Sequence, residues 1–201
     1  EEYVSLLRKF REQTGALTVI RVPDAKDFTE EEAFDYDIGK ILIETNGALS
    51  GKKLQEILLN RYGLQTEMSS GNYVLAMTSF MDTKEGFERL AAALKEIDAA
   101  LTGSKKKEIF SPKEIYRQPE KAMEIDEAQD GGAECITFSG AEGEVCADYI
   151  YLYPPGIPVI VPGEVFDVQT LDAIQKCQKL GLDVEGLPQA DRVNVVISKR
   201  N

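Results

Sequence analysis

The stretch SGKKLQEILLNRYGLQTEMSSGNYVLAMTSFMDTKEGFERLAAALKEI, residues 50–97, alternates between helix and strand patterns. Its first part predicts a helix that Ser50 caps and Gly63 ends, because apolar residues recur at helical spacing between them. Residues 64–67 and 73–80 predict two strands, and the polar residues 69–72 between them are typical of a turn. A second amphipathic helix follows, capped by Asp82 or Thr83.

The N-terminal flank completes this pattern. Residues 3–14 predict a helix that ends at Gly15, residues 16–22 a short extended run, and the acidic residues 24–32 a loop. Residues 38–43 predict a further strand. The order strand, helix, strand, strand, helix predicts an α+β fold, with a split βαβ domain over residues 1–102. In such a domain a mainly antiparallel sheet carries its helices on one face.

The C-terminal flank predicts a second domain. Residues 103–110 are rich in lysine and polar side chains and predict a linker, so a smaller α/β domain is expected over residues 111–201. Its predicted helices begin at Ser111-Pro112 and after the cap Asp167, and its predicted strands cover residues 148–152, 159–161 and 193–197. The Gly- and Glu-rich residues 129–144 predict an exposed loop or hairpin.

The composition argues against a nucleic-acid-binding protein and against a membrane-spanning segment. The chain has 201 residues, a net charge of -12 and 43% hydrophobic residues, which is ordinary for a globular protein. The charge argues against nucleic-acid binding and is compatible with cationic ligands, although it also serves solubility alone. No run reaches the roughly 20 apolar residues of a membrane helix. The chain begins at Glu1 directly in a helical pattern and without an initiator Met, so we expect a piece of a longer protein.

The cysteine and histidine counts narrow the chemistry. Three cysteines (Cys135, Cys146 and Cys177) without a CxxC spacing argue against a disulfide framework and favour a reducing compartment, the cytoplasm. The chain has no histidine, which excludes Ser-His-Asp and Cys-His catalysis within it and any histidine-containing zinc site. We expect no metal site.

The most unusual segment is YIYLYPPGIPVIVPGE, residues 149–164. Its four prolines fix φ and remove backbone donors, and its two glycines permit turns or close backbone approach. On physical grounds alone it predicts a stiff apolar strand–turn–strand ribbon that orients a domain.

This segment also carries a resemblance. YPPGIP followed three residues later by PGE is similar to the signature of the C-terminal domain of the Orn/Lys/Arg decarboxylases. SPKEIYRQPEKAMEIDEA, residues 111–128, resembles the linking helix and capping strand of that family. Residues 50–97 resemble the small domain that follows the cofactor domain in its fold type I enzymes. The stretch 129–139 departs from the family pattern.

The resemblance implies a pyridoxal-phosphate-dependent parent that converts arginine, lysine or ornithine to an amine. In the family, the lysine that bonds the cofactor lies in the large domain, after a Ser-x-His type motif. This chain lacks that motif, and Ser104-Lys105 and Ser198-Lys199 are better interpreted as surface lysines. We therefore expect no cofactor in this chain and no activity from it alone. The implied partners are a basic amino acid, a missing N-terminal cofactor domain and a second copy in a homodimer or higher oligomer, without nucleic acid or membrane.

The resemblance also implies site residues. Glu67 matches a family glutamate that faces the distal cation of the substrate, although a solvated strand-end glutamate is the alternative. The signature residues are expected at the route into the active site or in a structural role: Tyr153, Pro154, Pro155, Gly156, Ile157, Pro158, Pro162, Gly163 and Glu164. Glu164, just before a predicted helix, favours the structural role. No catalytic residue is expected in this chain.

Two further functions stay open. The chain could be a non-catalytic binding or regulatory module derived from the family, or an oligomerisation domain. An upstream reading frame with the cofactor motif favours the enzyme, whereas an exposed apolar patch is expected of a domain separated from its partners.

Overall fold

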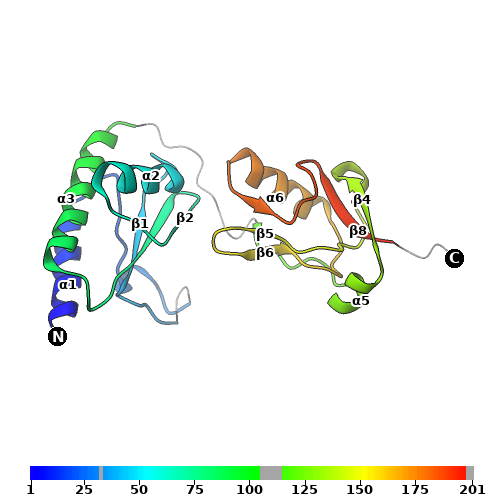
Figure 1. Ribbon diagram of the computed structural model, residues 1–201, viewed down its shortest axis with the longest axis horizontal. Helices are drawn as coiled ribbons and strands as arrows, with labels where there is room; N and C mark the ends of the chain where they lie inside the picture. Colours follow the sequence, from blue (N-terminus) through cyan, green and yellow to red (C-terminus); the bar gives the residue numbers. More distant parts are fainter. Residues whose placement is uncertain (32–33, 105–114, 198–201) are drawn as a thin grey trace. The chain divides into compact units, whose positions relative to one another are not determined.

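The computed structural model describes residues 1–31, 34–104 and 115–197. The chain forms two compact units, Glu1–Phe110 and Ser111–Asn201 (Figure 1). Both combine helices with antiparallel strands, which confirms the predicted α+β class. Most of the predicted linker 103–110, and the helix predicted at Ser111-Pro112, lie outside the described residues.

The first unit contains a three-stranded antiparallel sheet. Its strands are β1 (Lys40–Glu44), β2 (Met68–Ser70) and β3 (Tyr73–Met77), in the order β1-β3-β2. Because side chains alternate along a strand, β1 and β3 each present one buried face. The side chains buried on that face are Ile41, Ile43, Val74 and Ala76.

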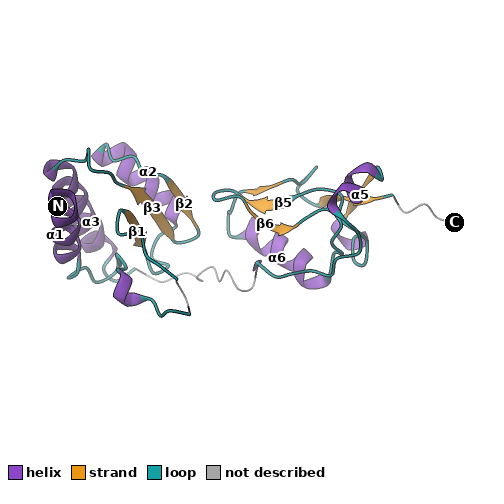
Figure 2. Cartoon of the chain, turned by 90° about the horizontal axis from the view of Figure 1, so that it is seen from below, coloured by secondary structure: helices purple, strands orange, loops and turns teal. Residues whose placement is uncertain are grey.

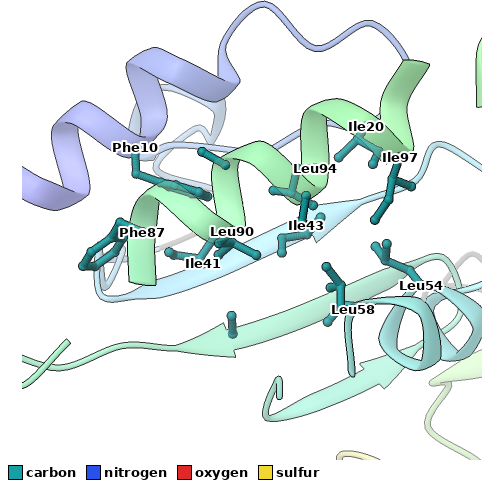
Figure 3. Close-up of a cluster of buried hydrophobic side chains, with 14 of the residues drawn as sticks. Phe10, Ile20, Ile41, Ile43, Leu54, Leu58, Phe87, Leu90, Leu94 and Ile97 are labelled. Carbon is teal, nitrogen blue, oxygen red and sulfur yellow. The ribbon is translucent and has the colours of Figure 1, made fainter. Parts of the chain in front are cut away.

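Three helices pack against this sheet: α1 (Glu2–Thr14), α2 (Gly51–Tyr62) and α3 (Lys84–Leu101). As predicted, Ser50 caps α2, accepting a hydrogen bond from the Lys53 N–H at 3.2 Å, and Gly63 ends it in the left-handed conformation. Figure 2 shows α2 beside β2 and β3. Apolar side chains from all three helices, from β1 and from the segment that follows α1 meet in one core (Figure 3): Phe10, Ile20, Ile41, Ile43, Leu54, Leu58, Phe87, Leu90, Leu94 and Ile97.

The prediction of an extended run over residues 16–22 is wrong, because a buried carboxylate accepts hydrogen bonds from the backbone N–H groups of this segment. Asp98, on α3, is 7% exposed. It accepts hydrogen bonds from the N–H groups of Thr18, Val19 and Ile20 at 2.7–3.2 Å and from the Thr18 hydroxyl. These N–H groups are thus satisfied without a neighbouring strand, and only Arg21 forms an isolated bridge, to Glu44.

The prediction of a strand over residues 64–67 is also wrong, because the start of this segment forms the C-terminal cap of α2. The Leu64 N–H returns to the Leu58 carbonyl at 2.9 Å, six residues back, which closes the helix after Gly63. The strand starts only at Met68, and the predicted turn 69–72 therefore shrinks to Gly71 and Asn72.

The second unit holds two small antiparallel sheets. One pairs β4 (Ala133–Thr137) with β8 (Arg192–Val196), and the other has the order β6-β5-β7. The latter strands are β5 (Ile150–Leu152), β6 (Ile157–Ile160) and β7 (Val184–Glu185). Two of its helices are α5 (Ile125–Asp130) and α6 (Val168–Lys179), and the predicted cap Asp167 accepts from the Thr170 N–H at 2.6 Å.

Residues 129–144 are not the predicted exposed loop or local hairpin. Strand β4 lies within them and pairs with β8, which is more than 50 residues away in the chain, with Ile136 opposite Val193. Most of β4 is exposed, and it begins with Ala133 and Glu134, which are residue types depleted in strands.

Candidate functional site

Glu67 lies immediately before β2, one of the two edge strands of the first sheet. Its N–H donates to the Leu75 carbonyl at 2.9 Å, so its backbone is fixed to β3. The side chain is exposed and forms no ion pair with any residue that the structure describes. Glu67 therefore offers a free carboxylate from an ordered backbone position.

A polar bridge supports the segment around Glu67. The Gln55 amide, on α2, donates to the Thr66 hydroxyl at 3.1 Å. Its carbonyl oxygen accepts from the Ser69 hydroxyl at 2.9 Å. One side chain of α2 thus holds both flanks of Glu67. We call this contact the Gln55 bridge.

The proline-rich segment has two structurally different halves. Its first half forms the turn between β5 and β6, in which Leu152 pairs with Ile157. The peptide bonds preceding Pro154 and Pro155 are cis. Tyr153 is 60% exposed and Ile157 45% exposed, and Pro155, Gly156 and Pro158 are exposed as well. This half presents an apolar turn on the surface of the second unit.

The second half is built into its own unit. Pro162 and Gly163 are buried, and Gly163 has φ 90°. A Cβ atom there would lie 2.5 Å from the Met123 carbonyl oxygen, so only glycine fits. The Glu164 carboxylate accepts from the Val161 N–H at 2.9 Å, across the same turn. These contacts show that Gly163 and Glu164 stabilise the turn.

A cavity of about 750 Å³ lies between α1 and the segment that follows it in the first unit. Arg8, Arg11, Arg21 and Lys26 line it together with Glu12, Asp24 and Asp27. Arg11 is held by the Ile38 carbonyl at 3.0 Å and by Asp24 at 3.3 Å. The cavity thus combines both signs of charge. The sequence gives no signal for this cavity, because its lining residues are spread from Leu7 to Asn46.

The remaining reactive side chains give no second site. Burial raises the pKa of the Cys146 thiol to about 12 and that of Cys177 to about 11, so both are protonated and inert near neutral pH. Within residues 1–31, 34–104 and 115–197, no group of three or more acidic, Cys or His side chains could hold a metal ion. No helix in these ranges is both long enough and apolar enough to cross a membrane.

The sequence of this chain is similar to a known protein family and to known decarboxylases. Residues 104–187 match the family described as Orn/Lys/Arg decarboxylase, C-terminal domain. An arginine decarboxylase of Bacillus anthracis is 28% identical over 187 residues, covering 92% of this chain and 38% of that protein. The chain is related to the C-terminal portion of the Orn/Lys/Arg decarboxylases. This confirms the resemblance carried by the proline-rich segment.

Solved lysine decarboxylases share this fold. The Francisella novicida enzyme LdcF matches with a TM-score of 0.72 and 18% identity, and the constitutive enzyme of E. coli with 0.69 and 17%. Each match covers 97% of this chain and 39% of the other. The chain therefore spans less than two fifths of the decarboxylases it matches.

Pyridoxal phosphate, the cofactor implied for the decarboxylase parent, does not fit the described residues. The cofactor is held through a lysine in a site that excludes water. Every described lysine in this chain is exposed or half-buried. Lys26, the lysine that lines the cavity, is itself exposed on the surface.

Glu67 is predicted from the sequence, whereas the Gln55 bridge is not. Gln55 lies outside the apolar face that defines α2, and Thr66 and Ser69 fall where a strand and a turn were predicted. The available signal was the polar run around Glu67. It does not specify which helix residue meets it, since that depends on how α2 packs on β2.

Proposed function

We propose that this chain is the C-terminal portion of a pyridoxal-phosphate-dependent decarboxylase of arginine, lysine or ornithine. Its role is to recognise the distal cation of the substrate and to form part of the route into the active site. The cofactor, when bound elsewhere in the parent, supplies the electron sink for loss of the carboxylate. The parent is cytoplasmic and forms a homodimer or a higher oligomer.

The observation that carries this proposal is the free Glu67 carboxylate on an ordered edge in a fold shared with lysine decarboxylases. All three amino acids present a cation at the end of their side chain, either an ammonium or a guanidinium. A carboxylate is the natural partner of that cation, through charge-assisted hydrogen bonds. In this chain Glu67 has no competing ion pair among the described residues.

The exposed half of the proline-rich segment supports a second role. Its prolines keep the turn rigid, and Tyr153 and Ile157 project apolar surface from it. We assign this surface to the active-site entrance or to the contact with the cofactor domain. The buried half, with Gly163 and Glu164, anchors the turn to the unit.

The test is Glu67→Ala in the full-length parent, assayed by CO₂ release from each amino acid. If Glu67 binds the distal cation, kcat/KM falls by about 2–5 kcal/mol in barrier terms, the range for truncating one partner of a desolvated charge pair. Glu56→Ala is the matched control, because Glu56 is also exposed and forms a surface ion pair with Lys53, at 2.9 Å. Unchanged kinetics in Glu67→Ala would remove the recognition role. A folded parent without CO₂ release from any of the three would favour a non-catalytic module.

A further inference from the structure

We infer that Gln55 is a positioning residue that sets the place of the Glu67 carboxylate. The inference rests on the proposed role of Glu67 and extends it to a side chain on another element. It starts from the Gln55 bridge, which contacts the residue immediately before Glu67 and the residue two positions after it.

The bridge adds a support from α2 to a segment that is otherwise paired with β3. β2 is an edge strand of three residues, and on its outer side no strand of the described residues pairs with it. On the paired side, the Glu67 N–H reaches Leu75. On the helix side, Thr66 is 8% exposed and its hydroxyl bonds to Gln55. Gln55 therefore ties Thr66 and Ser69 to α2 by side-chain hydrogen bonds.

Gln55 is dispensable for the helix itself. The helix is held to the core by Leu54 and Leu58, which are fully buried, whereas Gln55 is half-buried. Its removal leaves those contacts intact, and residues such as Ala and Met are good helix formers. The consequence is therefore local, because the backbone that carries Glu67 loses one of its two supports. A binding group that is not held in place loses affinity for its ligand.

The first test is a double-mutant cycle in the full-length parent, with Gln55→Met and Gln55→Ala each combined with Glu67→Ala. Met keeps the side-chain volume and removes the hydrogen bonds. We expect kcat/KM to fall about tenfold, mainly through KM, when Gln55 alone is changed. In the Glu67→Ala background the same change should have no further effect, because its action passes through Glu67. Gln178→Ala, which removes a 2.8 Å bond to the Ala190 carbonyl, is the control.

Independent losses at Gln55 and Glu67 would overturn the inference, since a merely structural residue lowers activity in both backgrounds. A second test does not depend on activity. In the 201-residue chain, amide hydrogen exchange at Glu67 should quicken about tenfold in Gln55→Met, while exchange in α2 stays unchanged. Unchanged exchange at Glu67 would refute the positioning role. If Glu67→Ala leaves kinetics unchanged while exchange quickens in Gln55→Met, the proposed function fails but the positioning holds.

Discussion

Replacing Asp98 by Ala should strongly destabilise the first unit, because this buried carboxylate holds the Thr18–Ile20 segment. The Asp98 carboxylate accepts five hydrogen bonds from the Thr18–Ile20 segment, the shortest 2.7 Å long. Asp98 is 7% exposed, and its removal leaves the N–H groups of the buried Ile20, the half-buried Val19 and the exposed Thr18 without their acceptor. A buried donor left unsatisfied costs about 1–3 kcal/mol. With some donors rescued by water, we expect a loss of about 3–4 kcal/mol in the free energy of unfolding.

The assay is urea unfolding followed by far-UV circular dichroism, with hydrogen exchange to assign each transition to its unit. Asp82→Ala is the matched control, since Asp82 accepts a single N–H bond from Ser79 at an exposed turn. We expect that control to lose less than about 1 kcal/mol. A loss below about 1 kcal/mol in Asp98→Ala would refute the view that this carboxylate holds the segment.

The same site gives a pH dependence. Burial on its own raises the pKa of Asp98, but hydrogen bonds from the backbone N–H groups of Thr18, Ile20 and Val19 outweigh it and hold the pKa below its ordinary value. The folded state thus favours the charged form. Its stabilisation is complete above the ordinary pKa, near 4, and is lost as pH falls through the lower folded value. The stability gap between the wild type and Asp98→Asn should therefore be constant at neutral pH and shrink below about pH 4.

Two further predictions concern the second unit. Gly163→Ala should cost it about 2–4 kcal/mol, because a Cβ there would lie 2.5 Å from the Met123 carbonyl oxygen at a φ of 90°; equal urea midpoints would contradict this. In the native chain only the exposed Cys135 should react rapidly with a thiol reagent at pH 8, because burial raises the pKa of Cys146 to about 12 and that of Cys177 to about 11. After unfolding in urea, all three thiols should react with the reagent. Rapid labelling of three thiols before unfolding would show that Cys146 and Cys177 are not buried.

Elements with local signals could be predicted from the sequence. Helix α2 has its cap at Ser50 and its left-handed end at Gly63, so both limits are encoded in neighbouring residues. Strand β4 could not be found in the same way, because its partner β8 lies more than 50 residues later and most of its side chains are exposed. The segment 16–22 has strand-forming residues, but its backbone N–H groups donate to Asp98, which lies on a helix much later in the sequence.

In the candidate site, too, the features with a local sequence signal could be predicted, and those that depend on packing could not. Glu67 is marked by its position between α2 and a glycine-containing turn, which the sequence displays. The Gln55 bridge depends on how α2 lies against β2, and that packing is set by Leu54 and Leu58 on the core side. The proline-rich segment was predicted as one rigid ribbon, whereas the structure divides it into an exposed turn and a buried anchor. Only the burial of each residue reveals that division.

The central claim is that this chain supplies recognition to a decarboxylase whose cofactor is held elsewhere in the parent. The most direct measurement compares CO₂ release from arginine, lysine and ornithine by the full-length parent and by the 201-residue chain, both with added pyridoxal phosphate. The account predicts release by the parent from at least one of the three and none by the chain, which forms no borohydride-trapped cofactor adduct. Turnover by the isolated chain, with stoichiometric trapping of the cofactor on one of its lysines, would contradict it.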